Sequence, residues 1–307
     1  MNSRLIDIFL QVASINALSQ QEKPVADYIR SFLSHNHFNI SEDNSNKISG
    51  SNTGNIICRV GDGGDFILLS HMDTARPTLK MRPVFTDGKI QSAGDTVLGV
   101  DNRLGIAVIL YTLEKIVKEN ISTKNFTVVF TTCEETTLLG SKSLKLSAQI
   151  NRGFIFDSSF RPGSFIHSAC GSKGFKVKIK GKASHSGIAP EKGINAISVA
   201  ANAVHKIKQG RIDENTTINI GKIAGGSAVN VVSEETLLEG EIRSFDVDKI
   251  AELTEQVKKI FINEAAKLKA EIEFESDWDF KPYTVDKDNL VFKEISKVLK
   301  KINLTPS

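Results

Sequence analysis

The sequence predicts an α/β protein in which a small α+β domain is inserted into a larger domain built on a helix-covered sheet. In the first half of the chain, near-continuous apolar strand patterns alternate with helical patterns, which is typical of a mixed or parallel sheet covered on both faces. From Gly174 the pattern alternates strictly, as in a strand with one solvent-exposed face. A last helical pattern follows, and we expect it to return to the first domain.

The larger, first domain is expected over residues 1–173. It opens with two helical patterns, and the second begins at Ser19 with Glu22 three residues later, a capping-box signature. A polar stretch over residues 41–55 predicts a loop. Four short apolar runs then predict strands, with one helical pattern among them. The runs are Asn55–Val60, Phe66–Ser70, Phe126–Thr132 and Gly153–Phe156, and the helix is Leu104–Val117.

The inserted domain is expected over residues 174–282, and residues 283–307 are expected to begin the returning, incomplete part of the first domain. Its elements follow the order strand, helix, strand, strand, helix, strand, which is that of a ferredoxin-like domain. In chain order they are Phe175–Lys180, Ile194–Ile207, Thr217–Gly221, Leu237–Phe245, Lys249–Ala270 and Glu271–Phe274. The final helix is expected over Asp288–Ile302.

Composition narrows the classes of function. The chain has 307 residues with a net charge of only +3, which gives no argument for a nucleic-acid or membrane partner. No apolar run approaches the roughly 18 residues that a membrane span needs, and the N-terminus does not resemble a signal peptide. The three cysteines lack the spacing of a disulfide framework or a thiolate zinc site. We therefore expect a cytoplasmic protein.

One imidazole and several carboxylates follow the predicted strands or precede the predicted helix. They are His71, Asp73, Asp101, Glu134, Glu135 and Asp157. In open α/β sheets ligands bind beyond the carboxyl ends of the strands, so these side chains are expected in one crevice. So much negative charge needs cations to neutralise it. Imidazole and carboxylate ligands without thiolates suit zinc, manganese or cobalt.

Each of these residues also has an ordinary structural interpretation. His71 and Asp73 could form a hydrogen-bonded loop, and a Glu pair is common in the solvated first turn of a helix. Asp101 could cap the helix that follows it, and Asp157 could open an Asx-turn. Their joint occurrence at strand ends and loops favours the metal site.

Four stretches carry a resemblance to the co-catalytic dinuclear zinc peptidase and deacylase family. They are residues 70–74, 98–102, 132–135 and 156–157. Residues 181–187 and 190–196 resemble the dimerisation domain of that family, so the resemblance covers most of the chain. Asp157 stands where carboxypeptidases and deacylases of the family tend to carry Glu, which favours a peptidase T-like (tripeptide aminopeptidase-like) member. A cytoplasmic homodimer that acts on short peptides is implied.

The resemblance implies two divalent metal ions, zinc first, with cobalt or manganese as alternatives. His71 and Asp157 resemble terminal ligands of one ion, Asp101 resembles the carboxylate that bridges both ions, and Glu135 resembles a ligand of the second. The implied activity is a zinc-dependent metallopeptidase that releases residues from the N-terminus of short peptides through a metal-bridging hydroxide.

The remaining site residues also come from the resemblance. Glu134 matches the general base, and Asp73 matches the carboxylate that orients the ligand imidazole. In the inserted domain, His185 resembles an imidazole that stabilises the oxyanion in the partner subunit. Asn230 resembles an amide that positions substrate, and Arg243 could pair with a substrate carboxylate. A turn histidine, a loop amide and a solvated arginine are the ordinary alternatives.

The end of the chain departs from the family pattern. Family members carry a further metal-binding His in a C-terminal segment, whereas no His follows His205 here. We therefore expect a chain truncated at its C-terminus, with an incomplete second metal site. Asn102 replaces a second acidic residue after Asp101, which is not a principal ligand. Two alternatives stay open, an N-acyl amino acid deacylase of the same family and a non-catalytic, truncated dimeric homologue.

Overall fold

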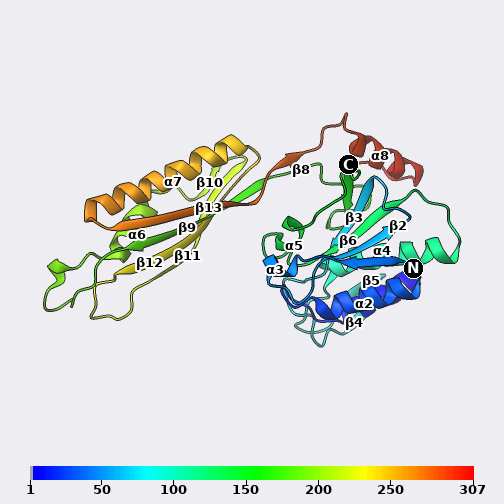
Figure 1. Cartoon of the computed structure of the whole chain (residues 1–307), viewed down its shortest axis with the longest axis horizontal. Helices are drawn as coiled ribbons and strands as arrows, with labels where there is room; N and C mark the ends of the chain where they lie inside the picture. Colours follow the sequence, from blue (N-terminus) through cyan, green and yellow to red (C-terminus); the bar gives the residue numbers. More distant parts are fainter. Residues whose placement is uncertain (1–2) are drawn as a thin grey trace. The chain divides into compact units, whose positions relative to one another are not determined.

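The computed structural model describes residues 3–307, which form two compact units. The first unit runs to Phe165 and includes the C-terminal segment Lys293–Ser307, and the second is Ile166–Phe292. The second unit is thus inserted into the first along the chain (Figure 1). The boundaries expected from the sequence, at residues 174 and 282, fall inside this second unit.

The first unit is built on a mixed five-stranded sheet with the order β1-β2-β6-β3-β7. The strands are β1 (Asn39–Glu42), β2 (Ile56–Val60), β3 (Phe66–His71), β6 (Phe126–Thr131) and β7 (Arg152–Ile155). Strand β3 runs parallel to both β6 and β7, while β2 pairs antiparallel with β1 and with β6. Because all six residues of β6 are buried, the centre of the sheet is covered on both faces, as the sequence predicts.

Three helices of the first unit share a core with the sheet. They are α1 (Ser3–Ala13), α2 (Lys23–His35) and α4 (Val100–Lys118). Their buried apolar side chains, such as Ile8 and Ile106, pack with Phe130 of β6 in one cluster. Helix α4 is kinked at its start, where Asp101 and Asn102 have non-helical backbone angles, so Asp101 lies on a bend ahead of the regular helix.

The structure differs from the sequence predictions in three places of this unit. Helix α2 begins at Lys23 rather than at Ser19, and the Ser19 hydroxyl donates to Asp73 instead. The polar stretch predicted as loop begins with the last two residues of β1 and also contains the short helix α3 (Asn46–Ser49). A hairpin of β4 (Pro83–Thr86) and β5 (Lys89–Ser92) was not predicted.

The C-terminal segment contacts the first residue of β7 and the chain that follows this strand. Helix α8 (Leu290–Lys301) carries Glu294, whose Oε2 is 2.8 Å from Nε of Arg152. Ser307 donates its backbone N–H to the carbonyl of Gly163 and accepts one from Phe165.

A short helix, α5 (Leu139–Lys142), follows β6. The part of the chain that the structure describes has no helix with the length and hydropathy of a membrane span.

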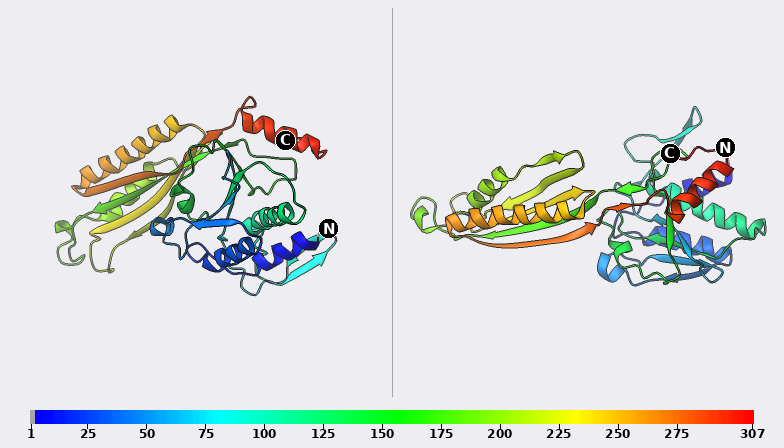
Figure 2. Two further views of the ribbon diagram at one scale, coloured as in Figure 1. Left: turned by 45° about the vertical axis from the view of Figure 1, so that its right-hand side comes forward. Right: turned by 90° about the horizontal axis from the view of Figure 1, so that it is seen from above.

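The second unit is an antiparallel sheet with the order β10-β11-β12-β9-β13 and two helices packed on it (Figure 2). Without β10, this is the 4-1-3-2 order of a ferredoxin-like fold, as predicted. The elements are β9 (Gly171–Lys180), α6 (Ala196–Lys206), β10 (Gly210–Asp213), β11 (Thr216–Gly225), β12 (Glu235–Ser244), α7 (Val247–Leu268) and β13 (Glu271–Phe280). A two-stranded ladder of β8 (Ser168–Ala169) and β14 (Tyr283–Thr284) precedes and follows them.

Strand β9 explains the alternating pattern seen in the sequence. Its Phe175, Val177 and Ile179 are buried in the core of this unit with residues of α6 and α7, such as Val199 and Phe261. The lysines between them face the other side, where none is buried. One face of this sheet therefore forms the core and the other is at least partly exposed.

Candidate metal centre

Three strands and one helix bring the predicted acidic residues to one edge of the first sheet. His71 ends β3, Glu134 and Glu135 follow β6, and Asp157 follows β7. Because β3, β6 and β7 are parallel, their carboxyl ends lie at the same edge. Asp101 comes from the start of α4. The predicted clustering is therefore found in the structure.

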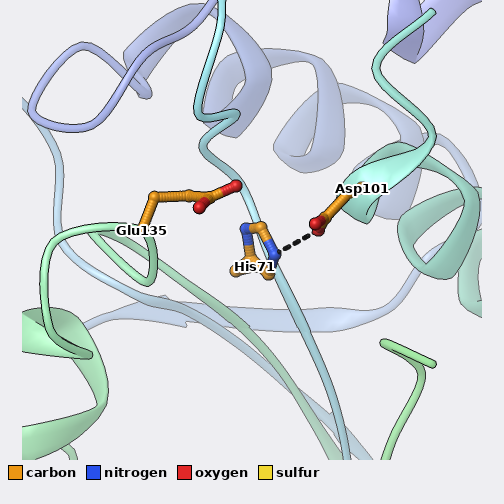
Figure 3. A group of neighbouring side chains, drawn as sticks. All are labelled: His71, Asp101 and Glu135. Atoms are coloured by element: carbon orange, nitrogen blue, oxygen red, sulfur yellow. Dashed lines mark hydrogen bonds and ion pairs between the residues drawn. The ribbon is translucent and has the colours of Figure 1, made fainter. Parts of the chain in front are cut away.

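The ring of His71 is at the centre of the cluster. Its Nε2 atom lies 2.9 Å from Oδ1 of Asp101 and 3.8 Å from Oδ2 of Asp157. One ligand atom from each of His71, Asp101 and Glu135 lies within 4.8 Å of the others. Figure 3 shows the carboxylates of Asp101 and Glu135 approaching the His71 ring from two sides. This donor set, one imidazole nitrogen with carboxylate oxygens, fits a divalent cation such as zinc.

Asp73 lies behind the ring, on the side opposite the candidate ligand atom. Its Oδ1 is 3.3 Å from Nδ1 of His71, and its backbone carbonyl is 3.1 Å from the same nitrogen. Asp73 is fully buried and also accepts the backbone N–H groups of Glu134 and Glu135. A carboxylate in this position fixes the imidazole tautomer that leaves Nε2 free to bind a metal.

The charges of this cluster perturb its titrations. Burial alone would lower the pKa of His71, but the neighbouring carboxylates of Asp101, Asp157 and Asp73 raise it to about 12. Burial, followed by the charge of Asp101, raises the pKa of Glu135. The hydrogen bond with His71 lowers the pKa of Asp101. Since a metal ligand must be a neutral imidazole, a bound cation would replace the proton that this negative cluster holds on His71.

Glu134 is half-buried beside the cluster, with Oε2 3.9 Å from Nε2 of His71. Burial, together with the negative charges of Asp157 and Glu135, raises the pKa of Glu134 to about 7. β6 already ends at Thr131, so Glu134 and Glu135 lie on a turn, and strand alternation does not set their directions. Both carboxylates reach the neighbourhood of His71.

Buried polar residues that the sequence did not single out surround the site. Arg103 is fully buried and donates to the backbone carbonyls of Met72 and Ala17. Burial lowers its pKa to about 10, against the opposing charges of Asp73 and Glu22. Arg103 lies two residues after Asp101, inside a helix with mostly apolar buried positions. This position in the sequence was the signal that could have identified Arg103, because a cation on a buried helix face requires polar partners.

A pocket of about 330 Å³ adjoins the cluster. Asp101 and Glu135 form part of its wall, and much of the remainder is apolar side chain or backbone. Its lining residues are Thr74, Ala75, Arg76, Val97, Leu98, Gly99, Val100, Asp101 and Glu135. The Ala75 backbone N–H in this wall donates to Oε1 of Glu135, at 3.1 Å. The pocket therefore offers mainly apolar surface next to two candidate ligands.

The three other predicted site residues lie in the second unit. His185 pairs with Val231 in an isolated β-bridge, and Asn230 accepts the backbone N–H of Ser186 through its carbonyl. The Arg243 guanidinium makes two hydrogen bonds to Glu241, of 3.0 and 2.9 Å. His185 and Asn230 are thus neighbours, while Arg243 already has a carboxylate partner on its own strand.

Comparisons with known proteins address the family of the chain. The M20 peptidase dimerisation domain matches residues 167–269, and the M42 glutamyl aminopeptidase family matches residues 81–209. The uncharacterised protein YqjE of Bacillus subtilis is 32% identical over 278 residues, which cover 89% of this chain and 75% of YqjE. The chain belongs to the M20 peptidase family.

Two solved structures extend the comparison to the fold. A tripeptidase from Staphylococcus aureus has a TM-score of 0.85 at 29% identity, covering 99% of this chain and 84% of that one. The aminopeptidase PepT from Bacillus cereus has a TM-score of 0.83 at 29% identity, covering 99% and 83%. This M20 family member is therefore peptidase T-like, as the sequence predicts, and is a metal-dependent hydrolase by its relatives.

Proposed function

We propose that the chain is an aminopeptidase that removes N-terminal residues from short peptides, with divalent metal held by the His71 cluster. The convergence of His71, Asp101 and Glu135 within 4.8 Å carries this proposal. The likeness to a tripeptidase and to an aminopeptidase supports the substrate class. The mainly apolar pocket beside Asp101 and Glu135 gives room for a substrate side chain.

In this proposal His71 and Asp157 hold one ion, Asp101 is shared, and Glu135 belongs to a second ion. Zinc is the first candidate, because imidazole and carboxylates are its usual ligands in hydrolases. When bound, such ions polarise the scissile carbonyl and lower the pKa of water. Asp73 keeps the His71 ring in the orientation that ligation requires, since its backbone carbonyl accepts from Nδ1 and its carboxylate Oδ1 lies 3.3 Å from the same nitrogen.

Glu134 is the proposed general base. It binds no metal in this assignment, yet its carboxylate lies within 3.9 Å of the ligand nitrogen of His71. A pKa of about 7 suits a group that takes a proton from water and gives it to the leaving amine near neutral pH. The half-buried position limits access of bulk water to this carboxylate.

The second unit is the proposed dimerisation domain, consistent with its match to the M20 dimerisation domain. We assign His185 and Asn230 to contacts with substrate, and Arg243 to a substrate carboxylate. For Arg243 the substrate would have to displace Glu241, which accepts two hydrogen bonds from the guanidinium at present.

A substrate panel tests the proposed activity. The chain is stripped of metal with a chelator, reloaded with Zn²⁺, Co²⁺ or Mn²⁺, and offered di- and tripeptides with free or acetylated N-termini together with N-acyl amino acids. We expect hydrolysis of free-amine peptides only, and only after reloading. Preference for the N-acyl amino acids would support the deacylase instead. Metal-independent activity, or none with any substrate, would contradict the proposal.

A further inference from the structure

Three consecutive residues, which include the candidate base and a candidate ligand, donate their backbone N–H groups to buried carboxylates. The N–H of Cys133 donates to Oε1 of Glu22 at 2.9 Å. The N–H groups of Glu134 and Glu135 donate to the two oxygens of Asp73, each at 3.1 Å. Successive N–H groups that converge on anions in this way form a nest, and here the anions are side chains of the protein itself.

The carboxylate of Glu22 is buried and accepts several hydrogen bonds besides that from Cys133. It is 0% exposed, at the N-terminus of α2, and its Oε2 accepts the Ser51 hydroxyl at 2.5 Å. Oε1 also accepts the backbone N–H of Gln20 and the thiol of Cys133. A carboxylate with this many donors is held in one position and is costly to move.

Ser19 connects the same segment to the second carboxylate. Its hydroxyl donates to Oδ2 of Asp73 at 2.8 Å. Ser19 and Glu22 have the spacing of a capping box, but α2 begins only at Lys23. Their side chains instead bond to Asp73 and Cys133, next to the candidate metal centre. The segment that enters α2 holds both carboxylates against the turn.

The turn itself is compact but irregular. Cys133 has a left-handed φ of 51°. The N–H of Gly140 donates to the carbonyl of Thr132, which closes the turn. A Cβ on Gly140 would lie 2.1 Å from the carbonyl of Thr132, so the two sides of the turn touch. Asn55 also bonds to Thr132 and Gly140. Asn55 thus fixes the base of the turn, whereas Glu22 reaches its first left-handed residue.

We propose that Glu22 is a positioning residue that sets the conformation of Cys133 and thereby the directions of the Glu134 and Glu135 side chains. The functional part of this inference rests on the proposed function, in which Glu134 is the base and Glu135 a ligand. Glu22 acts through the length of its side chain, which brings the carboxylate to the N–H of Cys133, and it contacts neither substrate nor metal.

The test separates the reach of Glu22 from its charge. Glu22→Asp keeps the charge but withdraws the carboxylate from Cys133, while Glu22→Gln keeps the reach and one accepting oxygen. Glu42→Asp is the matched control, because Glu42 likewise accepts a backbone N–H, that of Gly54, with Thr53 and Arg30 as its other donors. Amide hydrogen exchange at residues 133–135 and Co²⁺ affinity are measured on the full chain.

We expect Glu22→Asp to speed exchange at residues 133–135 and to weaken Co²⁺ binding about tenfold, the lower end of what loss of an outer partner of a metal site costs. Glu22→Gln and Glu42→Asp should stay within about twofold of wild type on both measures. Peptide hydrolysis by Glu22→Asp should lose kcat with little change in KM. Unchanged exchange and Co²⁺ affinity in Glu22→Asp would overturn the inference.

A second measurement needs no variant, in case Glu22→Asp does not fold. In the wild-type chain the amides of residues 133–135 should exchange as slowly as those of β6. Exchange at the rate of the exposed β4–β5 hairpin would equally overturn the inference. Neither exchange nor Co²⁺ binding requires peptidase activity, so an inactive wild-type chain would contradict the proposed function while leaving this test intact.

Discussion

Oδ1 of Asp73 lies 3.3 Å from Nδ1 of His71, two residues earlier in the chain. The same carboxylate accepts the backbone N–H groups of Glu134 and Glu135, which follow a different strand. One buried side chain therefore links the imidazole at the end of β3 to the two glutamates after β6. The candidate ligand imidazole and the backbone of the candidate base therefore share one partner.

Asp73→Asn should weaken metal binding about 10- to 100-fold. The amide keeps one accepting oxygen, but its NH₂ group faces donors that Asp73 now satisfies, and the negative charge behind the imidazole is lost. Isothermal titration with Zn²⁺ or Co²⁺ measures the change. Asp62→Asn is a suitable control, since Asp62 also accepts a backbone N–H, that of Gly64, but in a surface turn. Equal affinities for wild type and Asp73→Asn would refute the assigned role.

Glu134→Gln should reduce peptide hydrolysis about 10²- to 10⁴-fold while metal content stays nearly unchanged. The substitution removes the group that carries the proton, but no assigned ligand. Elemental analysis and initial rates on the same preparation measure both quantities. His71→Ala provides the contrast, because it removes the central ligand and should lose metal and activity together. Wild-type rates in Glu134→Gln would remove Glu134 from the mechanism.

Strand patterns and spacing were sufficient to predict four of the five strands of the first sheet, all but β1, and the position of the candidate site. Continuous apolar runs identify β3, β6 and β7, and parallel strands place the residues after their carboxyl ends at one edge. The clustering of His71, Glu135 and Asp157 could therefore be expected from the sequence alone. The alternation in β9 likewise identifies a strand with one buried face.

The parts that sequence could not predict depend on contacts between distant residues. Ser19 and Glu22 have a capping-box spacing, and local sequence does not reveal that tertiary partners, Asp73 and Cys133, take their hydrogen bonds instead. The β4–β5 hairpin has largely exposed strands, so it lacks the apolar periodicity that marks a strand. The direction of Glu134 depends on the left-handed Cys133, which no pattern indicates.

The second unit should pair two copies of the chain. Its match to the M20 dimerisation domain motivates this expectation, and a homodimer places the same surface of both copies in contact. Analytical ultracentrifugation of the purified chain at micromolar concentration should give about twice the mass of 33.6 kDa. A strict monomer over that concentration range would count against the dimer and against a role of His185 in a partner's site.

The pairing of α1 with α4 should make the stability of the first unit depend on pH. Glu114 of α4 is buried and accepts two hydrogen bonds from Arg4, of 2.9 and 2.7 Å, and these bonds, with Lys118, lower its pKa below the usual 4.5. A lowered carboxyl pKa stabilises the folded state fully above the unfolded pKa, and this contribution is lost as the pH falls through the folded pKa. Glu114→Gln should therefore cost about 1–2 kcal/mol at pH 7, and the difference from wild type should shrink below about pH 4.5.

Urea unfolding by circular dichroism measures this change in the free energy of unfolding. Fluorescence of Trp278, which lies in the second unit, reports the unfolding of that unit as an internal control. Glu119→Gln, which breaks an exposed pair with Lys115, should cost less than about 0.5 kcal/mol. A cost for Glu114→Gln that did not diminish with acid would show that packing, not the charge of Glu114, holds α1 against α4.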